Sequence, residues 1–258
     1  MDADLKGYFD TIPKDRLMSR VEERIADSRV LTLIRSYLDQ GVMDELTLHE
    51  PTDRGTPQGA VISPLLANIY LDPLDHLLAE SGVELVRYAD DFVLLGRSEE
   101  AAQAALARVQ TWVGANGLTL HPEKTRLVDA TQPGGFDFLG HHFGRGYRWP
   151  RRKSLDRLKD KVRQLTPRTS GVSLPAAIAR LNDTLQGWCG SFQHSHRTTF
   201  SGVDSSVRGR LRSIRCKRAG KRGRGRGTDH QQWRNHYFTE PGLFSMTQAH
   251  VSACQSSC

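Results

Sequence analysis

Three aspartates are candidate ligands for divalent metal ions. Asp4 stands near the start of the sequence, and Asp90 and Asp91 are adjacent in the segment ELVRYADDFVLLGR (84–97). Joining a 3′-hydroxyl to a nucleoside triphosphate uses two divalent cations about 3.5–4 Å apart. Hard Mg²⁺ prefers carboxylate oxygens and keeps several waters, so two or three aspartates on rigid neighbouring strands would be sufficient. An Asp-Asp pair also occurs in turns for reasons of turn geometry alone, and the pair by itself leaves both interpretations open.

The segments around these aspartates predict strands that position them. Two short apolar runs flank Ala-Asp-Asp, which predicts a β-hairpin over 84–97 with the acids at its bend. Apolar spacing predicts helices over 14–27, 30–38, 61–78 and 99–115, and strands over 3–5, 118–120, 125–128 and 136–143. This order of strands and helices predicts an α+β layer rather than regular βαβ winding.

The character of the chain changes near residue 150. Helices are predicted over 154–165, 174–188 and 202–215, followed by a basic low-complexity segment over 217–227. Residues 1–145 hold 14 basic and 23 acidic residues, a balance of −9, whereas residues 146–258 hold 22 and 6, a balance of +16. This asymmetry favours a carboxylate site in one domain and a surface for a polyanion in the other, although a merely soluble basic domain would show the same charge.

Composition excludes several classes of protein. Hydrophobic residues make up 38% of the chain without an apolar run of the roughly 18 residues that a membrane span requires. The acidic start, MDADLKGYFD, does not resemble a signal peptide. The four cysteines are scattered without the spacing of a zinc site, which indicates reduced thiols and a cytoplasmic location. No membrane partner is expected, and the sequence predicts no oligomeric state.

The order of motifs resembles that of group II intron reverse transcriptases. The segments that resemble the palm motifs of that family are DADLKGYFDTI (2–12), RGTPQGAVISPLLANIYLDPLD (54–75), VRYADDFVLLG (86–96), GLTLHPEKT (117–125) and FDFLGHHF (136–143). The segments that resemble its maturase region are LNDTLQGWCGSF (181–192), VRGRLR (207–212), WRNHYF (233–238) and GLFSMTQAH (242–250). The resemblance covers essentially the whole chain. It implies an α+β polymerase palm, an antiparallel sheet with packed helices, over 1–145, and an α-helical thumb and maturase region over 150–258.

The resemblance implies a two-metal site with Mg²⁺ as cofactor. Asp4 is similar to the first metal ligand, with the Leu5 carbonyl beside it. Asp90 and Asp91 match the paired aspartates of the family, Asp90 as the more direct ligand. Lys124 resembles a lysine near the pyrophosphate that helps to protonate the leaving group, and a solvated surface lysine would look the same.

Other positions are similar to the nucleotide and primer contacts of the family. Phe9 matches an aromatic residue that crowds a ribose 2′-hydroxyl and so favours deoxynucleotides, and an ordinary core role for Phe9 stays open. Gln58 resembles the residue against the incoming nucleotide, and Gly59 would allow close backbone approach. The turn Phe138-Leu139-Gly140 looks like the element that grips the primer end.

Basic and aromatic residues of the second half are candidates for RNA contact. Basic side chains that neutralise phosphates release counterions and give a steep salt dependence. The residues assigned this role are Arg151, Arg152, Lys153, Arg208, Arg210, Arg212, Lys217 and Arg218. The aromatic candidates for stacking on unpaired bases are Trp188, Phe192, Trp233, His236 and Tyr237, of which Trp188 and Phe192, four residues apart on one helix, are better explained as core.

The sequence therefore predicts RNA-directed DNA polymerisation, with an RNA template or intron RNA, a DNA primer and deoxynucleoside triphosphates as partners. The fingers region of the family is expected upstream of Met1, so the chain is expected to be weakly active or inactive. No His-Asn-His nuclease module follows, so DNA cleavage is not expected. Two alternatives stay open: a non-catalytic RNA-binding splicing cofactor, and a gene remnant that does not fold.

Overall fold

The chain forms two compact units, Met1–Asp129 and Ala130–Cys258. The computed structural model describes residues 2–40, 42–44, 47–49, 53–56, 60–169, 171–221 and 227–255. The boundary lies earlier than the change near residue 150 in the sequence. Arg148 explains the difference, because its carbonyl accepts the His196 amide at 2.8 Å and its Nε donates to the His194 carbonyl at 2.7 Å. These bonds fasten the segment before residue 150 to the second unit.

A three-stranded antiparallel sheet lies at the centre of the first unit. Its strands are β1 (Asp2–Asp4), β4 (Glu84–Tyr88) and β5 (Asp91–Leu95), in the order β1-β5-β4. The β4–β5 hairpin confirms the prediction for 84–97, with the turn at Ala89 and Asp90. The apolar runs on either side of the acids pair with each other, which leaves the acids at the bend.

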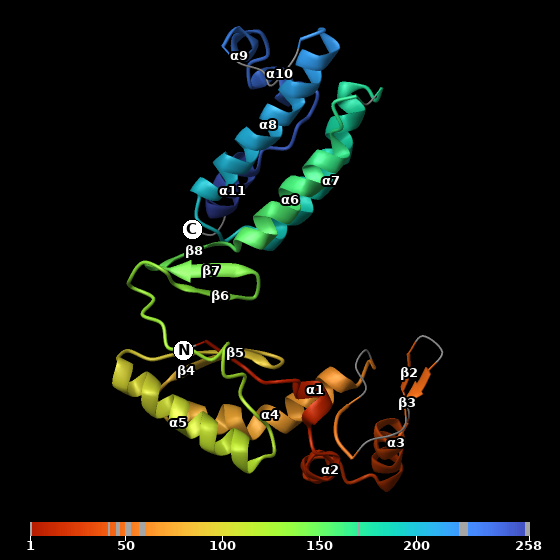
Figure 1. Cartoon of the computed structure of the whole chain (residues 1–258), viewed down its shortest axis with the longest axis vertical. Helices are drawn as coiled ribbons and strands as arrows, with labels where there is room; N and C mark the ends of the chain where they lie inside the picture. Colours follow the sequence, from red (N-terminus) through yellow and green to blue (C-terminus); the bar gives the residue numbers. More distant parts are fainter. Residues whose placement is uncertain are drawn as a thin grey trace. The chain divides into compact units, whose positions relative to one another are not determined.

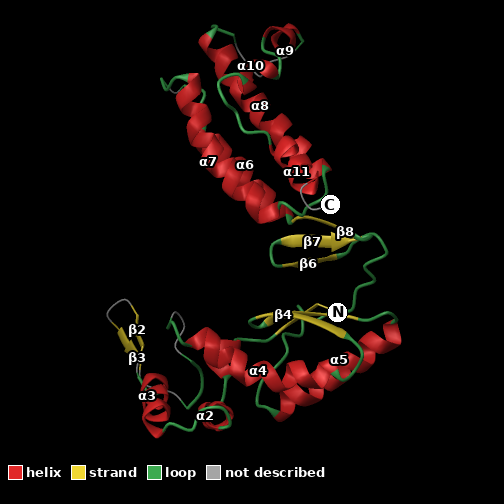
Figure 2. Cartoon of the chain, turned by 180° about the vertical axis from the view of Figure 1, so that it is seen from behind, coloured by secondary structure: helices red, strands yellow, loops and turns green. Residues whose placement is uncertain are grey.

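Helices α4 (Ser63–Ala79) and α5 (Glu99–Ala115) cover one face of this sheet, as Figures 1 and 2 show. The core between them includes Leu71, Leu74, Phe92 and Val109, each 0% exposed. The remaining elements of the unit are α1 (Tyr8–Thr11), α2 (Lys14–Glu22), α3 (Ser28–Leu38), and the paired strands β2 (Val42–Asp44) and β3 (Thr47–His49).

The predicted helices of the first unit are largely confirmed. The Ser98 hydroxyl accepts the Ala101 amide, so α5 begins directly after this cap, at Glu99 as predicted. The helix predicted over 14–27 is shorter, because α2 ends at Glu22. The strands predicted over 118–120 and 125–128 are wrong, since Leu120 forms only an isolated bridge with Leu5 and the structure has no strand between residues 116 and 135.

The second unit begins with another three-stranded antiparallel sheet. Its strands are β6 (Phe136–Phe138), β7 (His141–Gly144) and β8 (Tyr147–Pro150). The single strand predicted over 136–143 is wrong. The chain turns back at Leu139 and Gly140, both with positive φ (46° and 80°), a conformation that apolar spacing does not reveal.

The rest of the second unit is helical and has its own core. The long helices α6 (Arg152–Leu165), α7 (Leu174–Phe192) and α8 (Thr198–Arg218) contain the three predicted helices and extend beyond each of them. They are followed by α9 (Thr228–Gln232), α10 (His236–Thr239) and α11 (Met246–Gln255). Leu181, Leu211 and Phe238, all 0% exposed, join these helices in one hydrophobic cluster.

The α+β class is thus confirmed for the described chain. None of its helices combines the length and apolar character needed to cross a membrane. Cys189, Cys216 and Cys254 are free thiols.

Asp204 of α8 attaches α11 to the second unit. It is 5% exposed, and its carboxylate accepts the amides of Met246 and Thr247, each at 3.1 Å. The hydroxyls of Ser245 and Thr247 donate to the same carboxylate at 3.0 and 2.8 Å. These bonds satisfy amides at the start of α11 that have no partner within the helix.

Replacing this carboxylate should loosen the second unit. Asp204→Asn places an amide NH₂ among groups that donate, so we expect a loss of about 1–3 kcal/mol in the free energy of unfolding. Calorimetric melting of the full chain measures the loss. Asp183→Asn, a matched change at an exposed position of α7, should stay within about 0.5 kcal/mol of the parent. Equal stability of the two variants would contradict the role of Asp204.

Candidate active site

The β1–β5 pairing brings two of the candidate aspartates together. The register sets Asp4 directly opposite Asp91, and such cross-strand partners point to the same face of an antiparallel sheet. Phe92, the next residue in β5, is buried in the core under the helices. Because side chains alternate along a strand, Asp4 and Asp91 lie on the face away from the helices.

Asp90 occupies the turn between β4 and β5 and is half-buried. Partial burial raises the pKa of its carboxyl above the ordinary value, and the negative charge of Asp4 raises it further, whereas Lys124 lowers it. Ala89, immediately before it, has φ 55°, a left-handed conformation that a residue with a Cβ rarely adopts. The turn therefore concentrates electrostatic and backbone strain beside the strands that carry Asp4 and Asp91.

Lys124 forms an ion pair with Asp4, which the sequence did not predict. The Asp4 side chain is 14% exposed and the Lys124 side chain 61%. The bond to Asp4 raises the pKa of Lys124, and the charges of Asp91 and Asp90 add to the effect. The Asp4 carbonyl accepts the His121 amide at 2.8 Å, which holds the turn bearing Lys124 beside β1.

The donors at this site fit a hard divalent cation. Across the described ranges, no three His, Cys, Asp or Glu side chains converge as a ready metal site. Two carboxylates are nevertheless directly opposed, a third is adjacent in the turn, and the ammonium of Lys124 contacts Asp4 where a cation would bind. Carboxylate oxygens with room for water are the surroundings that Mg²⁺ prefers.

The predicted nucleotide contacts are described in part. Leu5 is 2% exposed, and the two hydrogen bonds around it use the Lys6 amide and the Asp4 carbonyl rather than its own carbonyl. Phe9 is half-buried at the edge of the core, with its ring centroid 5.6 Å from that of Tyr8. Gln58 and Gly59 lie outside the described residues.

The loop that leads toward position 58 packs against α1. The amides of Gly55 and Thr56 donate to the carbonyls of Ile12 and Phe9 at 2.8 and 2.7 Å. Gly55 has φ 88°, and a Cβ there would lie 3.0 Å from the Asp10 carbonyl oxygen, so only glycine fits this approach.

The predicted primer-grip residues lie in the second unit. Phe138 ends β6, and Leu139 and Gly140 form the turn into β7. The Gly140 carbonyl accepts the Arg151 amide at 2.8 Å, so this turn is fixed to the start of α6. Leu139 is exposed at the tip of the hairpin.

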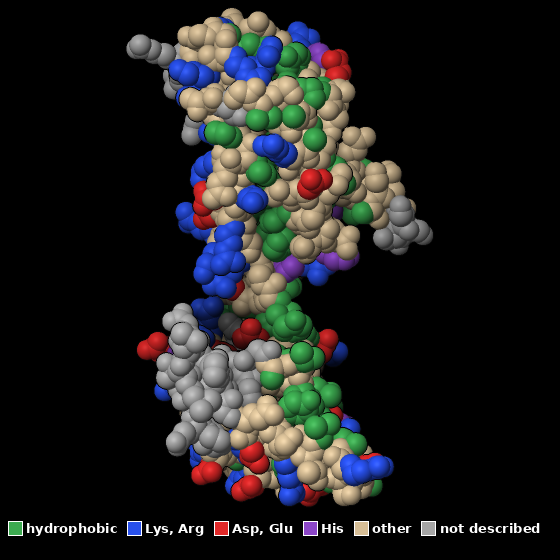
Figure 3. All heavy atoms as spheres, turned by 90° about the vertical axis from the view of Figure 1, so that its right-hand side faces the viewer, with side chains coloured by type: hydrophobic (Ala, Val, Ile, Leu, Met, Phe, Trp, Pro, Cys, Tyr) green, Lys and Arg blue, Asp and Glu red, His purple; other side chains and the backbone are tan. Residues whose placement is uncertain are grey.

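Most of the predicted RNA-binding residues lie at the surface of the second unit. Arg151, Arg152 and Lys153 are exposed where α6 begins, and Arg151 pairs with Asp137 at 2.9 Å. Lys217 and Arg218 are exposed at the end of α8. Figure 3 shows more Lys and Arg than Asp and Glu side chains on the visible face of this unit.

The structure uses some of the residues predicted to contact RNA, Arg212, Trp233 and Arg210 among them, within the second unit itself. Arg212 is 6% exposed and donates to the Trp233 carbonyl at 2.9 Å and to Asn235 Oδ1 at 2.7 Å, so it does not fit the prediction of an exposed RNA contact. Trp233 is 5% exposed and is likewise unavailable for base stacking. Arg210 donates to the Thr166 carbonyl at 2.7 Å. Helix periodicity alone places VRGRLR on a helix without revealing which arginines face its neighbours.

The other candidates for stacking are divided between core and surface. Trp188 packs against the second hydrophobic cluster, as expected, and its ring centroid lies 4.6 Å from that of Phe192. The Cζ atom of Arg215 lies over the Tyr237 ring, 5.5 Å from its centroid. His236 is exposed.

Comparison with known proteins assigns the chain to a class. Residues 1–143 match the family described as reverse transcriptase (RNA-dependent DNA polymerase). The chain belongs to this family. Residues 155–234 match the group II intron, maturase-specific domain, which places it among the group II intron-encoded reverse transcriptases and maturases.

Individual relatives agree with this assignment. Protein YkfC of Escherichia coli is 34% identical over 55% of this chain and 45% of its own length. An uncharacterized 91 kDa protein in the cob intron of Schizosaccharomyces pombe is 41% identical over 50% of this chain and 23% of its own length. Group II intron-encoded protein LtrA of Lactococcus lactis is 39% identical over 31% of this chain and 13% of its own length. The chain spans less than half the length of each.

The ionisation of Asp90 should cost stability when no metal is bound. Its pKa is raised in the folded chain, so the fold binds this proton more tightly than the unfolded chain does. In EDTA, Asp90→Asn should therefore raise the Tm at about pH 7. The gain should disappear as the pH falls below 3.8, the ordinary pKa of the carboxyl, because both proteins then carry a neutral group in the folded and the unfolded state. Melting curves across this range measure it, and a lower Tm for the variant at neutral pH would contradict the sign.

Proposed function

We propose that the chain catalyses RNA-directed DNA synthesis at Asp4, Asp90 and Asp91. The observation that supports this most directly is the register of Asp4 opposite Asp91, with Asp90 in the adjoining turn, in a chain of the reverse transcriptase family. Residues 1–145 would be the palm, and residues 150–258 the thumb and maturase region.

The three aspartates would hold two Mg²⁺ ions, with the Leu5 carbonyl as a further oxygen ligand. Bound there, the ions would activate the attacking 3′-hydroxyl and stabilise charge on the leaving pyrophosphate. Lys124 carries a proton at neutral pH, as an ordinary lysine does, and would give it to the leaving group.

Neighbouring residues would select and position the substrates. The half-buried Phe9 ring would exclude a ribose 2′-hydroxyl by contact, because buried Tyr8 beside it limits its movement. Gln58 and Gly59 would lie against the incoming deoxynucleotide, and Phe138, Leu139 and Gly140 would grip the end of the DNA primer.

DNA synthesis should depend on Asp90. We expect Asp90→Asn to reduce extension of a DNA primer on an RNA template by at least about 100-fold, because the amide removes a charged metal ligand. The measurement is primer extension with Mg²⁺ and deoxynucleoside triphosphates. Asp183→Asn, an exposed acid in the second unit, serves as the matched control and should extend like the parent. Equal product from the Asp90 variant and the parent would refute the polymerase proposal.

We also propose that the second unit binds intron RNA through its exposed basic residues. The observations that support this are its positive balance of charge and the exposure of Arg151, Arg152, Lys153, Lys217 and Arg218. The match to the maturase-specific domain agrees with a role in steadying folded intron RNA. This role needs no metal and would persist in a chain that does not polymerise.

Salt dependence tests the RNA-binding surface. Replacing Arg152 and Lys153 together by Gln should make the negative slope of log K (the RNA association constant) against log salt shallower by about 2, because two phosphate contacts are lost. Filter binding to structured intron RNA between low and moderate salt gives the slope. Arg29→Gln removes a positive charge that is 92% exposed in the first unit and should leave the slope unchanged. Binding by the parent that does not weaken with salt would contradict the surface.

A further inference from the structure

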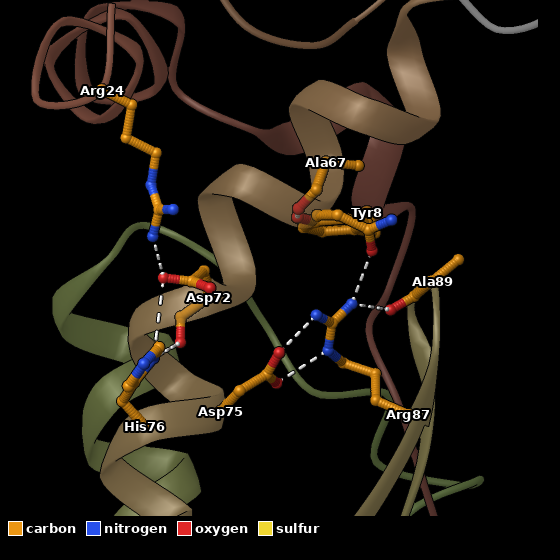
Figure 4. A network of polar contacts seen from close by, with 9 residues as sticks. Tyr8, Arg24, Ala67, Asp72, Asp75, His76, Arg87 and Ala89 are labelled. Carbon is orange, nitrogen blue, oxygen red and sulfur yellow. Dashed lines mark hydrogen bonds and ion pairs between the residues drawn. The ribbon is translucent and has the colours of Figure 1, made fainter.

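Arg87, the last residue but one of β4, lies at the centre of a polar network beside the Asp90 turn (Figure 4). Its Nε and Nη2 bind the two carboxylate oxygens of Asp75, at 2.8 and 2.5 Å. Its Nη1 donates to Asn68 Oδ1 at 2.8 Å and to the Ala89 carbonyl at 3.0 Å. One guanidinium therefore joins α4 to the backbone of the turn.

The α4 side of this network is built for a fixed orientation. Asn68 and Asp75 are seven residues apart, so they lie two turns apart on the same face of the helix. The Arg87 side chain is only 12% exposed and that of Asp75 32%. Asp75 raises the pKa of Arg87, so the guanidinium keeps its charge despite partial burial. A two-pronged Arg–carboxylate pair sets the plane of the guanidinium as well as its position.

On the other side of the network lies the turn between β4 and β5, which contains a residue in an unfavourable backbone conformation. Ala89 has φ 55°, a left-handed conformation that is unfavourable for a residue with a Cβ. Such a conformation persists only when surrounding contacts determine it. The bond from Arg87 to the Ala89 carbonyl fixes the peptide that joins Ala89 to Asp90.

Helix α4 also anchors α1. The Tyr8 hydroxyl donates to the Ala67 carbonyl at 2.5 Å, and burial raises the pKa of Tyr8, so it stays a neutral donor. Figure 4 shows the Arg87 guanidinium lying between Tyr8, Asp75 and Ala89. Arg87 does more than pack against these residues, because it also donates a hydrogen bond to the carbonyl of the left-handed Ala89.

We infer that Arg87 is a positioning residue for the proposed metal site: braced by Asp75 and Asn68, it fixes the Ala89 carbonyl and thereby the aim of Asp90. The inference rests on the proposed polymerase function, in which Asp90 binds a metal ion. If this role is correct, metal binding at Asp90 depends on the bidentate hydrogen bonding of Arg87, and a positive charge at position 87 is not enough to maintain it. Lysine keeps the charge but cannot bind Asp75 with two prongs while donating to Ala89.

Binding of Mn²⁺ to the full chain, followed by electron paramagnetic resonance, tests this role without requiring polymerase activity. Asp90→Asn defines which sites depend on the aspartate. We expect Arg87→Lys and Asp75→Asn each to weaken Asp90-dependent Mn²⁺ binding by about tenfold, the usual size of an effect on groups that orient a ligand. Hydrogen exchange of the peptides covering 84–95 should quicken in both variants, while the rest of the chain stays protected.

Arg24→Gln is the matched control. Arg24 pairs with Asp72, which lies on α4 three residues before Asp75, at 2.5 Å, and this pair does not touch the turn (Figure 4). Loss of the Arg24–Asp72 ion pair should change Mn²⁺ affinity by less than about twofold, because the hydrogen bonds of Arg87 stay intact.

The possible outcomes distinguish failure of the positioning role of Arg87 from failure of the proposed metal site. Unchanged Mn²⁺ affinity in folded Arg87→Lys would overturn the positioning role alone. An equal loss in Arg24→Gln would also overturn it, because any ion pair of α4 would then have the same effect. Absence of Asp90-dependent Mn²⁺ binding in the parent chain would overturn both the metal site and the role of Arg87. If Arg87→Lys melts at a much lower temperature, Asp75→Asn, which keeps one acceptor oxygen, decides the question.

Discussion

The antiparallel pairing of β1 with β5 is the constraint on which the candidate active site depends. The three residues of β1 pair with β5 and bring Asp4 opposite Asp91, although nearly ninety positions separate them in sequence. A slip of one residue would turn Asp4 to the other face of the sheet, since side chains alternate. The buried Leu5 opposes such a slip, because it would have to leave the core in which it is 2% exposed.

This arrangement places like charges close together, and the surrounding structure offsets their repulsion. Burial and the charge of Asp4 both disfavour ionised Asp90, and the ammonium of Lys124 compensates part of that cost from a turn held beside β1. A site that is electrostatically unfavourable when empty gains the most from a divalent cation, because binding removes the repulsion. Stability and the proposed chemistry thus make opposite demands on the same carboxylates.

The sequence predicted much of this architecture, and its failures have physical causes. The hairpin at 84–97 and α5 were predictable because apolar runs and apolar spacing are local signals. The turn at Leu139 and Gly140 was missed because apolar spacing does not report a positive φ. The burial of Arg212 depends on Trp233 and Asn235, more than twenty residues away. Arg87 went unnoticed for the same reason, since an arginine before Tyr-Ala-Asp-Asp acquires meaning only when α4 presents Asp75 to it.

Helix α4 serves as a common platform for two parts of the site. Through Ala67 it holds Tyr8 and hence the short helix that carries Phe9, and through Asp75 it holds Arg87 and hence the turn that carries Asp90. The contacts are eight residues apart on one helix. Helix geometry rather than loop structure therefore sets the distance between Phe9, for which we propose nucleotide selection, and Asp90, for which we propose metal binding. Its buried leucines at 71, 74 and 78, each 0% exposed, fix the helix in the core. Hydrophobic packing of α4 therefore determines the precision of the polar site above it.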